Sequence, residues 1–246
     1  MDVRLDGKVA FVTGGGGGFG RAFSAGFAES GASVAVVDWK LDDAESAAAS
    51  IRATGGKAQA FQCDVRLADA VNATVQRVVD EFGGLDILMN IAGQSGRSPA
   101  QELSEEDWDL TLDINLKGMF LCCKAAIPHL ISRGGGRIIN MASSRGIHGQ
   151  PNAVHYSASK GASIALTKSL AQELKQHRIT VNAIAPGGTD TPGWEGKTPP
   201  AEVAARRAKG NIGQPGDLVP MAVMLASDFG YQITGHLVVR DIYMPR

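Results

Sequence analysis

A glycine-rich loop between an apolar stretch and a helical pattern constrains the fold of this chain most strongly. Lys8–Thr13 (KVAFVT) is short, apolar and β-branched, as expected for a buried strand. After the glycines, apolar residues recur at helical spacing from Phe19 to Ser30 and stop at Gly31. Ser33–Asp38 (SVAVVD) is a second strand candidate. Strand, glycine turn, helix and strand within about 30 residues predict a βαβ unit.

The glycine loop, Gly14–Gly20, is a candidate phosphate-binding turn. Glycines let the backbone approach a pyrophosphate, and the following helix N-terminus offers free N–H groups. Taken alone, the loop could equally be a turn that binds nothing; the flanking elements favour a nucleotide. Asp38 closes the second strand, where a carboxylate can bind a ribose 2′-hydroxyl and repel a 2′-phosphate. This favours NAD over NADP, although Asp38 could be a surface acid and Lys40 could offset the repulsion.

The strand and helix patterns continue to alternate along the chain. Helices are expected over residues 41–54 and 67–82. Further strands are expected over Lys57–Gln62, Leu85–Asn90, Gly136–Ala142 and Ile179–Ile184. Alternation predicts an α/β fold with a doubly wound parallel sheet and helices on both faces. Ligands bind at the carboxyl ends of such strands. Four candidate segments fall there: Gly14–Gly20, Asp38, Asp64 and Asn90–Gly93.

Tyr156 and Lys160 carry the candidate chemistry. Four residues apart on a helix, they share one face. A phenol titrates near pH 10, and a neighbouring ammonium lowers its pKa, so the pair can serve as a general acid/base. Alone, the spacing also fits an ordinary amphipathic helix with a solvated lysine. Ser143 follows the predicted strand and precedes Tyr156 by 13 residues. Its hydroxyl can hydrogen-bond the same substrate oxygen as Tyr156, although by itself the residue could equally be a turn serine.

Composition excludes several classes of protein. A net charge of −1 over 246 residues gives no basic footprint for nucleic acid. No apolar run reaches about 18 residues, so we expect no membrane span. The N-terminus, Met1–Asp6, lacks the apolar stretch of a signal peptide, so we expect none. The cysteines, Cys63, Cys122 and Cys123, form no Cys-x-x-Cys pair, which favours a reduced, cytoplasmic setting. No metal site is expected.

Read in order, the motifs resemble those of the short-chain dehydrogenase/reductase family. The resemblance spans essentially the whole chain, and its specificity comes from all motifs being in register. They are Thr13-Gly14-x-x-x-Gly18-Phe19-Gly20, Asp64-Val65, Asn90-x-Ala92-Gly93, Asn115-Leu-Lys-Gly118, Ser143, Tyr156-Ser-Ala-Ser-Lys160, Pro186-Gly187-x-x-x-Thr191 and Ile233-Thr234-Gly235.

The resemblance implies one Rossmann-like domain over residues 1–246, with seven parallel strands, the last near His236–Arg240. It implies NAD(P)-dependent alcohol/carbonyl chemistry in a homodimer or homotetramer. Tyr156 would be the acid/base, Ser143 would orient the substrate oxygen, Lys160 would bind the nicotinamide ribose, and Asn115 would hold a relay water. The implied cofactor-binding residues are Gly14, Gly18, Phe19, Gly20, Asp38, Trp39, Asp64, Val65, Asn90, Ala92, Gly93, Tyr156, Lys160, Pro186, Gly187, Thr189 and Thr191.

Within that set, Asp64 and Val65 would contact the adenine and Thr189 and Thr191 the nicotinamide amide. Asn90 and Ala92 would lie on the adenosine ribose side. Asn115, read from the sequence alone, could instead be a satisfied core residue or mark a helix kink.

Two departures from the family pattern stand out. Ile91 replaces a common second asparagine. The chain ends Val239-Arg-Asp-Ile-Tyr-Met-Pro-Arg246 in place of a Val-Asp-Gly-Gly turn, so that only Asp241 remains of it and the C-terminal turn is in doubt.

The substrate loop is expected at about residues 191–211, with Trp194 its only large apolar side chain. A small polar substrate fits such a loop, and Arg145 or Arg97 could bind an anionic group on it. Arg145 could also point to solvent or pair with Asp190 or Glu195. The candidate substrate residues are Gln94, Ser143, Arg145, Tyr156 and Trp194.

Three functional classes follow, in order of preference. The first is an NAD-dependent dehydrogenase of a small secondary alcohol, a polyol or hydroxy acid. The second is an NADPH-dependent 3-oxoacyl-(acyl-carrier-protein) reductase, whose expected basic docking patch is not indicated by the near-neutral net charge. The third is a non-catalytic nucleotide sensor, disfavoured by the intact Asn115, Ser143, Tyr156 and Lys160.

Overall fold

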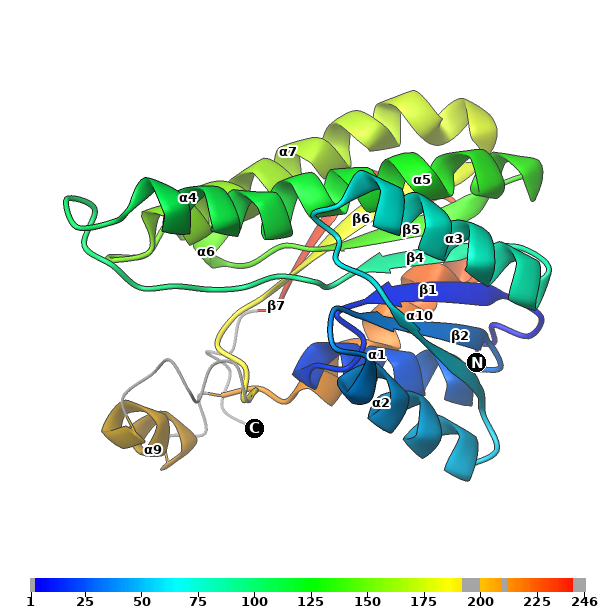
Figure 1. The fold of residues 1–246 in the computed structure, drawn as a ribbon, viewed down its shortest axis with the longest axis horizontal. Helices are drawn as coiled ribbons and strands as arrows, with labels where there is room; N and C mark the ends of the chain where they lie inside the picture. Colours follow the sequence, from blue (N-terminus) through cyan, green and yellow to red (C-terminus); the bar gives the residue numbers. More distant parts are fainter. Residues whose placement is uncertain (1–2, 192–199, 209–211, 241–246) are drawn as a thin grey trace.

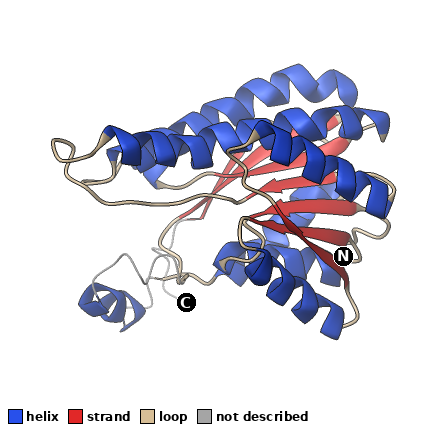
Figure 2. Ribbon diagram, in the orientation of Figure 1, coloured by secondary structure: helices blue, strands red, loops and turns tan. Residues whose placement is uncertain are grey.

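A seven-stranded parallel sheet forms the centre of the protein (Figures 1 and 2). The computed structural model describes residues 3–191, 200–208 and 212–240. Every neighbouring pair of strands is parallel, and the order is β3-β2-β1-β4-β5-β6-β7. The strands are β1 (Val9–Thr13), β2 (Ser33–Asp38), β3 (Lys57–Gln62), β4 (Ile87–Asn90), β5 (Gly136–Met141), β6 (Ile179–Pro186) and β7 (Leu237–Arg240). The predicted fold class is confirmed.

Helices cover both faces of the sheet (Figure 1). One face carries α1 (Gly18–Glu29), α2 (Leu41–Ala53) and α10 (Val219–Ala226). The other carries α3 (Ala68–Phe82), α5 (Gly118–Ser132) and α7 (Val154–Leu174).

Alternate strand residues feed two separate cores. Val12 and Val36 pack with Phe23 and Phe27 of α1 on one face. Phe11 and its neighbours pack with α3, α5 and α7 on the other. Each large side chain buried in this way contributes roughly 1.5–3 kcal/mol. Burial on both faces explains why these strands read as continuous apolar runs rather than alternating ones.

The long helix before β5 is interrupted by a wider turn. α4 (Glu105–Leu112) begins at Ser104, whose hydroxyl accepts the Asp107 N–H at 3.1 Å. Asp113–Lys117 is π-helical and leads directly into α5. By length and a mean hydropathy of 1.2, Glu105–Ser132 could cross a membrane, a test that core helices of globular proteins also pass. Here Met119 and Cys122 of this helix are packed against the sheet.

Three smaller elements lie near the predicted substrate loop or the strand ends. α6 (Arg145–His148), which the sequence did not predict, follows β5 and leads toward α7. α9 (Pro200–Ala208) lies in the expected substrate loop, most of whose remaining residues lie outside the described ones. β7 forms as expected, and its last residue, Arg240, makes an ion pair with Asp217 (2.5 Å). Asp241 and the turn around it lie outside the described residues.

Candidate active site

Two glycines shape the loop after β1. Gly14 has φ +64°, and a Cβ there would lie 2.9 Å from the Ala92 backbone nitrogen. A Cβ on Gly20 would collide with the Gly14 carbonyl oxygen. The loop therefore folds tightly against the end of β4 and brings α1 close to the strand edge, as the sequence predicts.

The start of α1 opens onto a pocket of about 860 Å³ at this edge. No side chain caps the N-terminus of α1 at Gly17. The first backbone N–H groups of the helix therefore remain available as hydrogen-bond donors beside the pocket. Gly18, Phe19 and Gly20 line it. Arg21 also lines it, and its Nε donates to the Gly16 carbonyl at 2.7 Å, holding the loop in place. Uncapped N–H groups and a cation suit the pyrophosphate of a dinucleotide.

Asp38 is held rigidly at the far side of the same pocket. Its Oδ2 accepts the Gly16 N–H (3.1 Å), and its Oδ1 accepts the Lys40 N–H (3.2 Å). The side chain of Lys40 lies 4.9 Å from the ring centroid of Trp39. The Asp38 carboxylate lines the pocket together with Trp39, where it can accept a hydrogen bond from a ribose hydroxyl.

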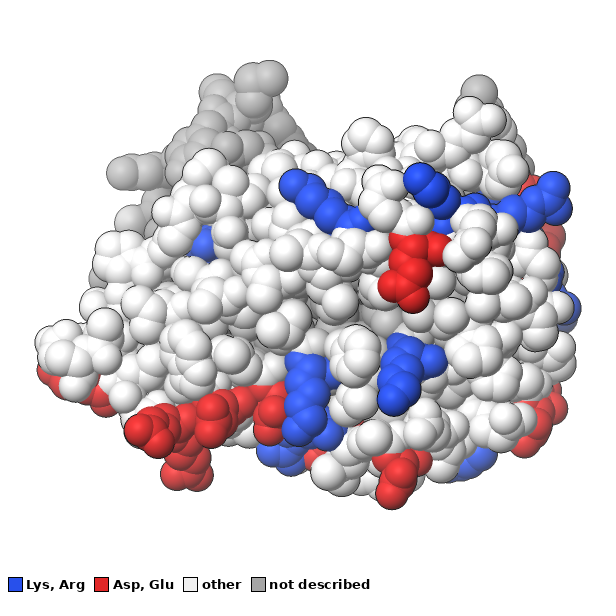
Figure 3. Space-filling model, turned by 90° about the horizontal axis from the view of Figure 1, so that it is seen from above, with Lys and Arg blue, Asp and Glu red and all other residues white. Residues whose placement is uncertain are grey.

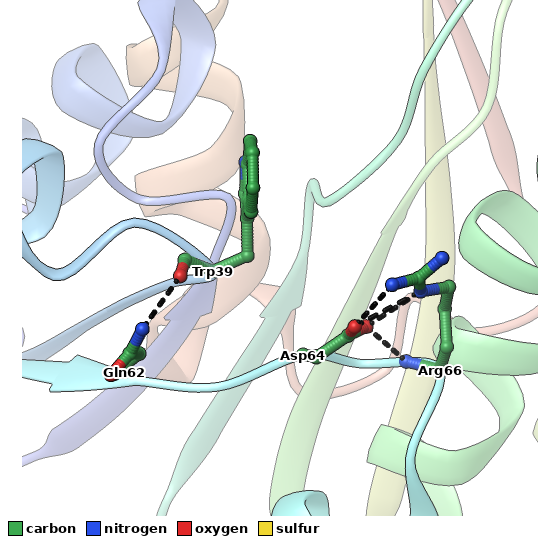
Figure 4. A network of polar contacts seen from close by, with 4 residues as sticks. All are labelled: Trp39, Gln62, Asp64 and Arg66. Atoms are coloured by element: carbon green, nitrogen blue, oxygen red, sulfur yellow. Dashed lines mark hydrogen bonds and ion pairs between the residues drawn. The ribbon is translucent and has the colours of Figure 1, made fainter.

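Figure 4 shows the outer end of this pocket, where Trp39 and Arg66 rise beside the strand ends and Asp64 lies between them. Arg66 binds both carboxylate oxygens of Asp64, with a shortest distance of 2.6 Å, and holds the pKa of Asp64 below its usual value. Gln62 donates to the Trp39 carbonyl at 3.1 Å. An exposed indole and a guanidinium at the same end of the pocket suit a stacked base such as adenine. The sequence-based prediction missed Arg66, which only a contact with Asp64 reveals.

The segment after β4 reaches the pocket from Ile91 onward. Ile91, Ala92, Gly93 and Gln94 line it, and Val65 lines it from the opposite strand end.

Asn90, by contrast, points into the sheet. Its amide donates to Asn140 (2.9 Å) and to Cys123 (3.3 Å), because β4 pairs with β5 in a register that sets Asn90 beside Asn140. The Asn90 side chain therefore braces the strand ends, and the position of Asn90 on the adenosine ribose side stays a prediction. Thr13, which the prediction left without a role, accepts the Ile91 and Ala92 N–H groups at 3.0 and 3.1 Å.

Tyr156 and Lys160 share one face of α7, as predicted. Lys160 is buried, donates to the Met141 carbonyl (2.7 Å) and lies 5.9 Å from the Tyr156 ring centroid. Burial lowers the pKa of Lys160 to about 8. Burial also raises the pKa of Tyr156, and this outweighs the lowering by the Ser143 hydrogen bond and the Arg145 charge. In the protein alone the net direction is thus opposite to the one expected from the Tyr/Lys pair.

Ser143 lies at the end of β5, beside Tyr156. Its Oγ accepts the backbone N–H of Arg145 at 3.2 Å, which leaves its hydroxyl proton for the Tyr156 oxygen or a substrate oxygen. The Arg145 guanidinium carbon lies 5.7 Å from the Tyr156 ring centroid. The Arg145 guanidinium thus lies over the ring of Tyr156, while its pairing with Asp190 or Glu195 stays a prediction.

Asn115 occupies the π-helical turn and is fully buried. Its Oδ1 accepts the Gln94 N–H (2.8 Å), and its Nδ2 donates to the Gln94 carbonyl (2.9 Å) and the Ser159 hydroxyl (3.0 Å). The turn thereby ties the pocket lining to the catalytic helix. A role in holding a relay water stays a prediction. Ser159 joins the site through this bond and was not predicted.

The segment after β6 closes the inner end of the site. Pro186 ends the strand, and the Gly187 N–H donates to the Arg240 carbonyl at 3.1 Å. The Thr189 hydroxyl donates to the Gly187 carbonyl (3.1 Å), whereas Thr191 lines the pocket. Trp194 lies outside the described residues. Over the described ranges, His, Cys, Asp and Glu side chains form no cluster that could hold a metal ion.

Comparison with known proteins decides the family. A model of the short chain dehydrogenase family matches residues 8–201. The chain belongs to this family. It is 40% identical to D-threitol dehydrogenase from Mycolicibacterium smegmatis, over 98% of this chain and 94% of that protein. It is 34% identical to a 3-oxoacyl-(acyl-carrier-protein) reductase from Thermotoga maritima, over 97% and 98%.

A structure from Beutenbergia cavernae with bound NADP at low occupancy matches 98% of each chain, with a TM-score of 0.91 and 31% identity. As a family member, this protein is an oxidoreductase of a secondary alcohol or ketone that uses a nicotinamide dinucleotide.

Proposed function

We propose that the protein is an NAD-dependent dehydrogenase that oxidises a secondary hydroxyl group of a small polyol to the ketone. One observation carries the proposal: Tyr156, Ser143 and Lys160 meet at the sheet edge at which the Asp38 carboxylate lines a dinucleotide-sized pocket. The dinucleotide, when bound, supplies the hydride acceptor.

The chain's own residues handle the proton. The Ser143 hydroxyl can donate its proton to the substrate oxygen in place of the Tyr156 oxygen, while its Oγ is held by the Arg145 N–H. Tyr156 takes the hydroxyl proton as the carbon gives up hydride, and the reverse transfer serves ketone reduction. Negative charge that develops on the oxygen is stabilised by the Ser143 and Tyr156 hydrogen bonds.

Asp38 supports NAD as the cofactor. Its two oxygens are fixed by backbone N–H groups, so the carboxylate cannot swing away from a 2′-phosphate. Lys40, which could have offset the repulsion, stacks on Trp39. A fixed carboxylate at this point repels the 2′-phosphate of NADP and accepts hydrogen bonds from the ribose hydroxyls of NAD.

The position of Arg145 favours an uncharged polyol over a hydroxy acid. The Arg145 guanidinium interacts with the ring of Tyr156, the acid/base residue, 5.7 Å from its centroid. The relative that acts on D-threitol, according to its name, supports the same substrate class.

A 3-oxoacyl-(acyl-carrier-protein) reductase is the second candidate, because one relative of nearly equal length carries that name. Its acidic carrier partner would be expected to dock on a basic surface, and the net charge of −1 offers no general one.

We also propose that a second copy of the chain covers the outer face of α4, α5 and α7. Figure 3 looks onto this side and shows a broad area without charged side chains. Trp108 of α4, Phe120 of α5 and Val154 of α7 are exposed, Phe120 to 45%. Exposed apolar side chains on these three helices fit a homodimer or homotetramer. Phe120→Glu should lower the mass measured by light scattering, and an unchanged mass would contradict this interface.

A cofactor-reduction assay tests the proposed activity. The protein is incubated with NAD or NADP and a panel of tetritols, hexitols and hydroxy acids, and separately with NADPH or NADH and a 3-oxoacyl thioester. We expect NADH formation with polyols. Thioester reduction with NADPH and no polyol oxidation would establish the second candidate instead.

A further inference from the structure

A second cation besides Lys160 lies against the catalytic tyrosine. The Arg145 guanidinium carbon is 5.7 Å from the Tyr156 ring centroid, and Lys160 Nζ is 5.9 Å from it. Cations within about 6 Å of an aromatic ring are attracted to it, and an ionised ring attracts them more strongly. The two cations differ in where they come from: Lys160 lies one turn along α7, whereas Arg145 belongs to α6.

A close backbone contact between α6 and α7 places Arg145 there. A Cβ on Gly146 would lie 2.6 Å from the Lys160 carbonyl carbon, and a Cβ on Gly161 would lie 3.2 Å from the Gly146 oxygen. Only a glycine at 146 allows the helices to touch in this way. Arg145 precedes that contact and has its backbone N–H fixed by Ser143 at 3.2 Å. Its backbone position is therefore set from both sides.

We propose that Arg145 is a positioning residue whose guanidinium, held over the Tyr156 ring by the contact between α6 and α7, supplies a permanent positive charge that favours the phenolate. The inference rests on the proposed function for its catalytic meaning. Its physical claim concerns the phenol itself and needs neither substrate nor cofactor.

The charges around Tyr156 support this assignment. Burial lowers the pKa of Lys160 to about 8, so its ammonium is lost in the alkaline range, whereas a guanidinium stays protonated. Lys160 also donates to the Met141 carbonyl rather than to the phenol. Arg145 is the cation whose charge lowers the pKa of Tyr156 among the described residues. The other ionisable groups on nearby elements are Lys160 and His155 of α7, His148 of α6, Glu105, Glu106, Asp107 and Asp109 of α4, Asp113 and Lys117 of the π turn, Arg97, and Asp190 after β6.

A spectroscopic titration of the free protein tests the inference. The chain has three tyrosines, so the tyrosinate absorbance of the wild type minus that of Tyr156→Phe isolates Tyr156. Arg145→Gln should raise the Tyr156 midpoint by about one pH unit, and Arg145→Lys by less, because the charge is kept. Arg52→Gln, which removes an exposed guanidinium from α2, should leave the midpoint unchanged.

Two further readouts separate this role from others. If turnover is found, Arg145→Gln should shift the acid limb of kcat/KM for alcohol oxidation upward by the same amount, with little change in KM at high pH. Gly146→Ala keeps Arg145 but forces α6 away from α7, so it should also raise the midpoint of the Tyr156 titration. The same variant tests the inference if Arg145→Gln does not fold.

A midpoint that is unchanged in both Arg145→Gln and Gly146→Ala overturns the inference whether or not the enzyme turns over. A raised KM for anionic substrates alone, with an unchanged midpoint, overturns it as well and assigns Arg145 to substrate binding. A shifted midpoint in a protein without polyol turnover supports the inference while the proposed function fails.

Discussion

The cofactor pocket and the catalytic group lie at the same edge of the sheet but are built by different means. The pocket is formed mostly by backbone: a glycine loop, free N–H groups at the start of α1, and one carboxylate fixed by N–H groups. The catalytic group consists of side chains with raised or lowered pKa values: Tyr156, which is half-buried, and Lys160, which is buried. The cofactor pocket depends mainly on backbone shape, whereas the catalytic group depends mainly on the charges of its side chains.

This difference implies that the two regions respond differently to substitution. Changes in the pocket should act on cofactor affinity and folding, because they alter backbone geometry. Changes at the catalytic group should act on turnover and on its pH dependence, because they alter proton affinity.

Removing the Tyr156 hydroxyl should have the largest effect. Tyr156→Phe keeps the ring but has no proton to exchange, so we expect kcat to fall by about 10³-fold or more. NAD affinity, measured by calorimetry, should change little, because the glycine loop and Asp38 are untouched. A comparable loss of NAD binding would break the separation between the two regions.

Filling the glycine turn should act on the pocket alone. A Cβ at Gly20 collides with the Gly14 carbonyl, so Gly20→Ala should cost about 2–3 kcal/mol of folding stability and weaken NAD binding strongly. Gly17→Ala is the matched control, since its Cβ would meet the same carbonyl at an ordinary 3.5 Å. Thermal unfolding with and without NAD measures both effects. Equal behaviour of the two variants would show that the turn is not tightly constrained.

Burial of Lys160 should appear in the pH dependence of stability. Its pKa is about 8 in the folded protein and 10.5 ordinarily, so between these values the unfolded chain holds more protons and stability rises with pH. Below pH 8 the cost of burying the ammonium is fully present.

Relative to Lys160→Met, the wild type should therefore gain about 2 kcal/mol between pH 8 and 10 in denaturant unfolding. Lys168→Met, on the exposed side of the same helix, should show no such gain. Parallel pH profiles for the wild type and Lys160→Met would show that the lysine is not buried as a neutral base.

Neutralising Asp38 should have the smallest effect. Asp38→Asn keeps the shape but removes the charge that repels a 2′-phosphate, so the ratio of kcat/KM for NADP to that for NAD should rise about tenfold. Asp69→Asn, on exposed α3, serves as the charge-matched control. An unchanged ratio would assign cofactor choice to other groups around the pocket.

The sequence predicts the backbone-built region better than the charge-built one. Periodicity predicts β1 to β6 to within two residues at each end, and the glycine loop and Asp38 lie where a βαβ unit puts them. These features are local, so their geometry follows from neighbours in the chain.

The details that sequence reasoning missed depend on contacts between distant segments. Asn90 turns into the sheet because β5 sets Asn140 beside it, a matter of strand order. Arg145 lies over Tyr156 because a four-residue helix touches α7 through Gly146. The net pKa direction of Tyr156 depends on burial, which spacing along a helix cannot reveal.

The measurement that tests the central claim most directly is isotope transfer. The protein is incubated with NAD and threitol deuterated at its secondary carbons, and the reduced cofactor is analysed by mass spectrometry. We predict NADH that carries one deuterium with the wild type and none formed with Tyr156→Phe. Reduced cofactor without deuterium, or deuterated product in equal yield from Tyr156→Phe, would contradict hydride transfer under Tyr156 acid/base catalysis.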